Sequence, residues 1–247
     1  MKIVYFLAIV QAFWEEKITQ VRHQLYTEQQ CSMPINRLKG SGDSFDRLEQ
    51  LYWFGYSPFS VIWNNHWDLM TGQIYWVNLS DKYPDAPLFP SGPIIWDNIM
   101  QSSLGDCYLV AAMAEISTIP KILDDIFVTK KTGKEYKLKL YVRGRPWIVN
   151  VDDQFLYHKE LDNLRFAYYE DSLWIPILEK ALAKIKGNYD QLEGGFPANM
   201  LRFLTGAPVF TYSALDEKTE EEVWYHLSSH HYLITASTKA LSDQKLN

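Results

Sequence analysis

The clearest pattern of hydrophobic and polar positions lies between residues 172 and 186. Apolar residues recur there at three- and four-residue spacing: Trp174, Ile177, Leu178, Ala181, Leu182 and Ile185. That spacing places them on one face of an α-helix. Gly187 follows the last apolar position, and glycine commonly ends a helix. The pattern therefore predicts an amphipathic helix over 172–186.

A second pattern alternates apolar and polar residues from Tyr136 to Val142, as in a half-buried strand. Thr132-Gly133 marks a turn before it. Gly144 provides the next turn, and Trp147 to Val151 predicts the returning strand of a hairpin.

The remaining elements are predicted from shorter patterns. Helices are expected at 13–30, 45–54, 121–127, 197–203 and 217–227, and strands at 73–78 and 232–237. Pro120 is expected to end the helix before it, Gly206 to follow the 197–203 helix, and Asp216 to cap the 217–227 helix. The aromatic-rich region 47–89 is interpreted as a tryptophan-rich core, with surface binding as the alternative.

The candidate chemistry lies in residues 101–115, where a polar loop leads into Cys107 and an alanine-rich apolar run follows. Asp106 is a residue type favoured at helix N-caps, so a buried helix is expected to start beside the cysteine. The positive end of the helix dipole favours a thiolate there. Gln101 carries an amide N–H donor that could stabilise a developing oxyanion. The alternative is that Cys107 is a small buried apolar residue.

Residues 101–112 read QSSLGDCYLVAA and resemble the active-site segment of the calpain family of cysteine proteases, Q-G-x-L-G-D-C-W-L-L-A-A. Ser102 and Tyr108 stand where that pattern has glycine and tryptophan. Further similar segments follow in the family's order: Trp147–Asp153, Leu178–Lys184, Gly187–Leu192, Gly194-Gly195 and Leu204–Gly206. The resemblance covers residues 90–237.

The resemblance implies an α+β papain-like cysteine protease fold with a central cysteine helix packed by the 172–186 helix. It divides the chain into an N-terminal extension (1–46), an aromatic-rich lead-in (47–89), the first subdomain of the protease core (90–208) and an incomplete start of the second subdomain (209–247). A strand in that second part, lacking its sheet partners, would expose an edge and apolar surface.

The resemblance also implies cysteine-type endopeptidase activity on protein or peptide substrates, through a Cys-His-Asn mechanism. Cys107 would be the nucleophile, and Gln101 would stabilise the oxyanion. The family's Gly-His-Ala and Asn-Pro-Trp segments are absent, and no histidine follows His231. His226, His230 and His231 are interpreted as solvated surface residues. We therefore expect this chain alone to lack peptidase activity, either as a truncated protease or as a non-catalytic calpain-like binding or regulatory module.

Calcium is the one cofactor that the resemblance suggests, and no covalent cofactor is expected. Glu179 matches a family glutamate that helps to hold calcium, and the family's second acid falls at Asn98, which can offer a carbonyl oxygen but no charge. Asp152-Asp153 is interpreted as a structural pair.

Composition changes this picture little. The net charge is −6 with no basic stripe, which gives no support to nucleic-acid binding. The two cysteines, Cys31 and Cys107, form neither a disulfide framework nor a zinc motif, so a cytoplasmic location is favoured. Residues 1–12 are interpreted either as a secretory signal or as the start of a strand or helix, and no apolar run is long enough for a membrane span. In a secreted protein, Asn78 would be a glycosylation acceptor.

Overall fold

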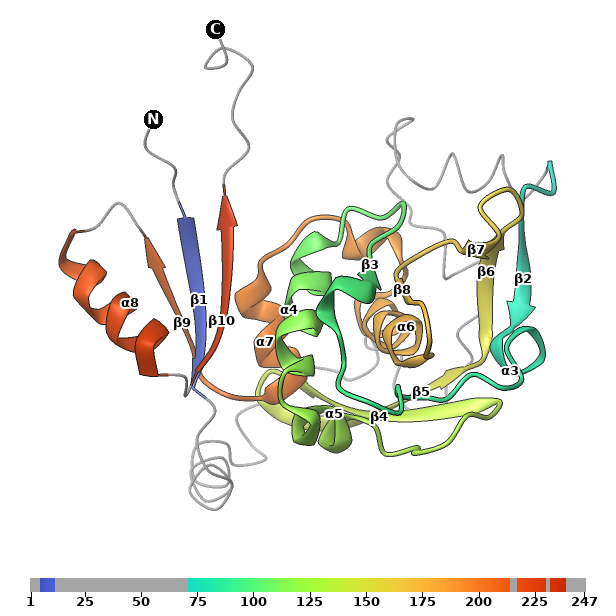
Figure 1. The fold of residues 1–247 in the computed structure, drawn as a ribbon, viewed down its shortest axis with the longest axis horizontal. Coiled ribbons are helices and arrows are strands. Elements are labelled where there is room, and N and C mark those ends of the chain that lie inside the picture. The colour runs from blue at the N-terminus through green and yellow to red at the C-terminus, as the bar shows by residue number, and fades with distance from the viewer. Residues whose placement is uncertain (1–4, 12–70, 214–216, 230–231, 239–247) are drawn as a thin grey trace, which may run out of the picture.

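A computed structural model of the chain describes residues 5–11, 71–213, 217–229 and 232–238 (Figure 1). The described part combines α-helices with antiparallel strand pairs, which is the α+β class expected. The helices predicted at 13–30 and 45–54 lie outside the described residues.

Helix α6 (Trp174–Lys186) forms where the periodicity predicts a helix, but it is buried on all sides and not on its apolar face alone. Every residue from Trp174 to Ile185 is buried. Gly187 caps the helix with a φ of 117°, which glycine adopts readily, and its N–H donates to the Ala183 carbonyl at 2.8 Å.

Strands β4 (Glu135–Val142) and β5 (Arg145–Asp152) form the predicted hairpin, with Val142 paired to Arg145. Arg143 and Gly144 at its tip have φ values of 53° and 76°. Positive φ at both central residues is typical of a type I′ turn, whose twist matches that of the strands. The alternating residues Tyr136, Leu138 and Leu140 are buried, so the period-two pattern marks the core face.

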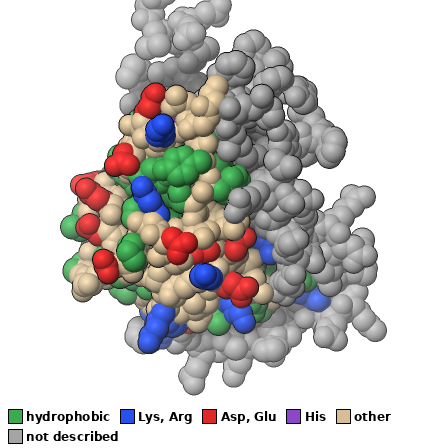
Figure 2. Space-filling model, turned by 90° about the vertical axis from the view of Figure 1, so that its right-hand side faces the viewer, with side chains coloured by type: hydrophobic (Ala, Val, Ile, Leu, Met, Phe, Trp, Pro, Cys, Tyr) green, Lys and Arg blue, Asp and Glu red, His purple; other side chains and the backbone are tan. Residues whose placement is uncertain are grey.

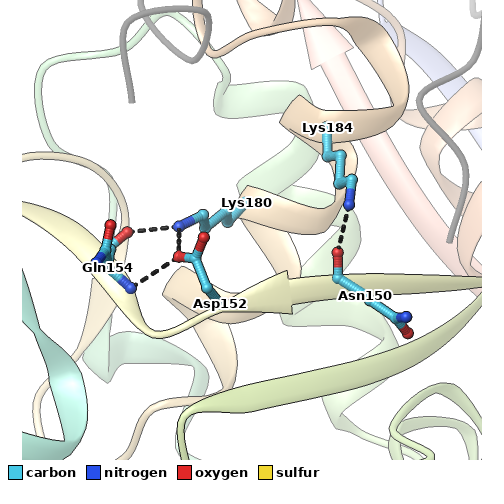
Figure 3. Close-up of polar contacts among 5 residues, drawn as sticks. All are labelled: Asn150, Asp152, Gln154, Lys180 and Lys184. Carbon is cyan, nitrogen blue, oxygen red and sulfur yellow. Dashed lines mark hydrogen bonds and ion pairs between the residues drawn. The ribbon is translucent and has the colours of Figure 1, made fainter. Parts of the chain in front are cut away.

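Two lysines of α6 hold strand β5 to the helix (Figure 3). The Lys180 Nζ donates to Asp152 Oδ1 and to the Gln154 carbonyl, and it lies 4.6 Å from the centre of the Phe155 ring. The Lys184 Nζ donates to the Asn150 carbonyl at 2.8 Å. Buried ammonium groups need such partners, so these contacts explain how two lysines fit into an apolar helix.

Strands β2 (Ile74–Asn78), β6 (Gln154–His158) and β7 (Asn163–Leu164) form a second antiparallel sheet, beside the short helix α3 (Leu79–Lys82). Figure 2 shows this side of the molecule, where apolar side chains gather in one patch among acidic and basic ones. Tyr75 and Leu161 are the large apolar residues of this region that remain exposed.

The third sheet has the order β10-β1-β9, with β1 (Tyr5–Gln11) antiparallel to both β9 (Val209–Ser213) and β10 (Tyr232–Thr238). Helix α8 (Glu217–Ser229) packs on β9 and β10. The expectation of a strand without sheet partners is therefore corrected, because the N-terminal apolar run pairs with β10. Local sequence could not show this pairing, since the two strands come from opposite ends of the chain.

Helices α4 (Cys107–Ser117), α5 (Pro120–Ile126) and α7 (Pro197–Thr205) occupy the middle of the molecule (Figure 1). Two expectations are corrected here. Pro120 starts α5, and α4 ends at Ser117. The helix packed along α4 is α7, whereas α6 approaches α4 near its first turn.

The connecting segments contain short elements: η3 (Trp96–Asn98), β3 (Ile99–Met100), β8 (Tyr168–Tyr169) and η4 (Asp190–Leu192). Among the described residues, no helix is both long and apolar enough to cross a membrane.

Candidate active site

Cys107 is the first residue of α4, and its side chain is exposed. The helix therefore begins where the sequence predicts. The interpretation of Cys107 as a buried apolar residue is wrong. The first N–H groups of a helix have no partner within it, and they carry the positive end of the dipole. A thiol at this position is accessible from solvent.

The loop before Cys107 is fixed by three hydrogen bonds. Gln101 Nε2 donates to the Leu104 carbonyl at 2.6 Å, and Ser103 Oγ donates to the Arg165 carbonyl at 2.9 Å. The Gly105 carbonyl accepts from the Gly194 N–H at 2.9 Å. An amide NH₂ has two hydrogens, so Gln101 can make this bond and still donate a second one. The structure thus holds the Gln101 amide within the cysteine loop.

Asp106 occupies the N-cap position, but its side chain makes no capping hydrogen bond. The prediction located the start of the helix correctly and gave the carboxylate the wrong partner. The residue is fully buried, and its carboxyl interacts with that of Glu179 of α6.

Glu179 is also fully buried, and its Oε1 accepts a hydrogen bond from the Ala167 N–H at 3.2 Å. Burial raises the pKa of Asp106 to about 6. Burial, and then the charge of Asp106, raise the pKa of Glu179 well above its ordinary value. Two neighbouring buried carboxyls cannot both ionise cheaply, so one of them keeps its proton at neutral pH.

The donor atoms of this pair are of the type that a hard cation takes. Both Asp106 oxygens and Glu179 Oε2 are buried and accept no hydrogen bond of good geometry. Carboxylate oxygens are the ligands that calcium and magnesium prefer. Asn98, the other predicted ligand, lies on η3, where its N–H donates to the Ile95 carbonyl at 3.0 Å. No contact described for it reaches Glu179, and the described residues contain no group of three or more metal-binding side chains.

The two histidines within the described ranges lie elsewhere. His158 Nδ1 accepts a hydrogen bond from the Leu161 N–H at 3.2 Å. His226 packs edge-on against Tyr232, with ring centres 4.4 Å apart, and its side chain is only 15% exposed. The interpretation of His226 as a solvated residue is therefore wrong. Neither histidine has a described contact with Cys107, while His23, His66, His230 and His231 lie outside the described residues.

Sequence reasoning missed three residues around the cysteine helix. The sequence predicts only a capping role for Asp106, marks Tyr108 only as a departure from the family pattern, and predicts no role for Glu115. Glu115 Oε1 accepts the Ile234 N–H of β10 at 2.8 Å. A charged residue inside an alanine-rich apolar helix was the one signal that could have suggested such a role for Glu115.

Known proteins match this chain over its larger part. The sequence profile of the family described as calpain family cysteine protease matches residues 54–247. A calpain of Schistosoma mansoni is 32% identical over 54% of this chain and 19% of its own length. Calpain-10 of Rattus norvegicus is 30% identical over 58% of this chain and 22% of its own length. A calpain-type cysteine protease of Zea mays, DEK1, is 31% identical over 53% of this chain and 6% of its own length. The chain thus spans less than a quarter of the length of these relatives.

Proposed function

Because the chain belongs to the calpain family of cysteine proteases, we propose that Cys107 is the nucleophile of a papain-like endopeptidase site. The observation that carries this proposal is an exposed thiol at the N-terminus of α4, beside a loop that fixes the Gln101 amide. A buried structural cysteine would need neither feature.

In the proposed reaction, Cys107 Sγ attacks the carbonyl carbon of the scissile peptide bond. The Sγ–C bond forms, the C=O π electrons move to oxygen, and the resulting oxyanion accepts hydrogen bonds from Gln101 Nε2 and the Cys107 N–H. Collapse of this intermediate breaks the C–N bond, and the leaving amine takes the proton that a histidine base had removed from the Cys107 thiol. Water then hydrolyses the thioester, which releases the acid product and restores the thiol. None of the described residues supplies that base, so we propose that this chain alone does not turn over substrate.

The alternative function is a calpain-like binding or regulatory module that holds peptides without cleaving them. The specific observation in its favour is that both described histidines are engaged away from Cys107, His158 with the Leu161 N–H and His226 against Tyr232. The two functions share one site and differ in whether a base reaches it.

Alkylation of Cys107 by a peptidyl chloromethyl ketone tests the nucleophile. We expect labelling of the Cys31→Ser chain at one site, with a rate that saturates in reagent concentration, and none in the Cys31→Ser, Cys107→Ala variant. Casein digestion then tests the proposed inactivity of the chain alone. No turnover by residues 1–247 agrees with the proposal, whereas turnover that disappears in Cys107→Ala would refute the proposed inactivity.

We also propose that Asp106 and Glu179 can hold calcium. The support is three buried carboxylate oxygens that accept no hydrogen bond from any other described residue. Bound calcium would supply positive charge at the base of the cysteine loop and offset the repulsion of the two acids. We expect millimolar calcium chloride to raise the melting temperature of the chain by several degrees, and to leave that of Glu179→Gln unchanged. An equal shift in both proteins would contradict the proposal.

A further inference from the structure

We propose that Tyr108 is a positioning residue that holds the segment 192–195 against the cysteine loop, where it forms one wall of the peptide-binding groove. This inference rests on the proposed function, because it assigns a role at the same site. The Tyr108 side chain, adjacent in sequence to the nucleophile, is buried.

Tyr108 follows Cys107 in the first turn of α4 and is buried. Its hydroxyl donates to the Leu192 carbonyl at 2.7 Å, and it accepts a hydrogen bond from Lys186 Nζ at 3.4 Å. The hydroxyl acts both as a donor and as an acceptor, so it links Lys186 at the end of α6 to Leu192 in the segment that follows. Burial raises the pKa of Tyr108 to about 12, with the charge of Asp106 as the next cause, so the hydroxyl keeps its proton at neutral pH.

The ring of Tyr108 leaves room only for glycine at position 195. A Cβ built on Gly195 would lie 2.5 Å from Cζ of Tyr108, closer than any real contact. The backbone of Gly195 therefore lies directly on the ring. One residue earlier, the Gly194 N–H donates to the Gly105 carbonyl at 2.9 Å.

Three contacts thus fix one segment beside the reactive thiol: Leu192 by the hydroxyl, Gly194 by the cysteine loop and Gly195 by the ring. Phe196 follows this segment and is 71% exposed. In the proposed arrangement a peptide bound at Cys107 runs along this wall, and an exposed aromatic residue at its end suits an apolar substrate side chain. Tyr108 itself touches no substrate in this arrangement and acts by setting the position of the wall.

The test compares two reagents on the Cys31→Ser chain: acetyl-Leu-Leu chloromethyl ketone, which must use the groove, and iodoacetamide, which need not. In both, an Sγ–C bond to Cys107 forms and a halide ion leaves, so the ratio of rates reports the groove. We expect Tyr108→Phe to lower the peptidyl-to-iodoacetamide ratio about fivefold, the factor of one ordinary hydrogen bond. The iodoacetamide rate should stay within about twofold.

Tyr141→Phe is the matched control, since Tyr141 lies equally close to Gly206 at the other end of α7. It should leave the ratio unchanged. An unchanged ratio in Tyr108→Phe would overturn the inference.

Hydrogen exchange of the Gly194 amide separates this inference from the proposed function. If the wild-type chain shows no saturable reaction with the peptidyl reagent, the proposed function fails. The positioning role is then decided by exchange alone. We expect Tyr108→Phe to speed Gly194 exchange about fivefold, and exchange at the wild-type rate would reject the role of Tyr108.

Discussion

At the scale of single residues, the buried acids Asp106 and Glu179 beside the cysteine loop make stability depend on pH. The raised pKa of Asp106, about 6, means that the folded state binds a proton more tightly than the unfolded chain, where the carboxyl titrates near 3.8. Its contribution to stability is therefore present at low pH and is lost as the pH rises through about 6.

This sign gives a prediction for Asp106→Asn. In the wild-type chain without divalent cations, the Asp106 contribution to the free energy of unfolding should fall by about 2 kcal/mol between pH 4.5 and 7.5. The variant should lack this fall, because its amide does not titrate. Urea unfolding at several pH values measures the difference, with exposed Asp85→Asn as the control for the lost charge. Parallel pH profiles for wild type and Asp106→Asn would contradict the prediction.

A second prediction concerns Lys180, a buried group whose charge is opposite to that of Asp106. Burial lowers the pKa of this lysine to about 8, against the partly compensating charge of Asp152. The folded state therefore releases its proton before the unfolded chain does, and stability rises with pH above about 8. We expect this rise to reach about 2 kcal/mol between pH 7.5 and 9.5.

The variant Lys180→Met has a side chain of similar volume but no titrating ammonium group, so the rise in stability with pH should disappear. Urea unfolding at the two pH values checks this, and Lys137→Met at an exposed position of β4 controls for net charge. A rise of the same size in Lys180→Met would show that other groups cause it.

At the scale of elements, the link between α4 and β10 depends on one side chain. Strand β10 has β1 on one edge, and on its other edge the Ile234 N–H is satisfied by Glu115 Oε1. Glu115→Ala would leave this N–H without a protein partner, at a cost of about 1–2 kcal/mol. Glu115→Gln retains a carbonyl oxygen and should lose much less.

Hydrogen exchange of the Ile234 amide measures this link directly. We expect clearly faster exchange in Glu115→Ala and near-normal exchange in Glu115→Gln. Equal protection in both variants would mean that the edge of β10 is covered by something other than Glu115.

The elements with a strong local period were predictable, and the contacts between distant elements were not. Helix α6 and the β4–β5 hairpin follow from spacing and from the glycines at 187 and 144, because those signals act within a few residues. The position of β1 between β9 and β10 depends on pairing across most of the chain, which no local pattern encodes. In the site, Cys107 and its helix were predicted. The partner of Asp106 was not, because only folding brings α6 to it.

At the scale of the whole molecule, the described residues form a packed first part and a smaller sheet attached to α4 and α7 (Figure 1). Most of the buried apolar residues belong to the first part. The outer side of the smaller sheet exposes Trp224 and Tyr225 of α8 at 63% and 65%, and Phe210 of β9 at 50%. Several large apolar residues exposed together favour self-association.

We therefore expect the purified chain to associate as its concentration rises, and the double variant Trp224→Lys, Tyr225→Glu to remain monomeric at the same concentrations. The two changes add opposite charges, so the net charge is unaltered and the effect reports lost apolar surface. Because both side chains are exposed, the free energy of unfolding should change by no more than about 0.5 kcal/mol. Sedimentation velocity over a concentration series measures the association. Leu161→Lys removes an equally exposed apolar side chain near the sheet of β2, β6 and β7, and it should leave the association unchanged. Association of the double variant at the wild-type level would exclude this face of α8 as its cause.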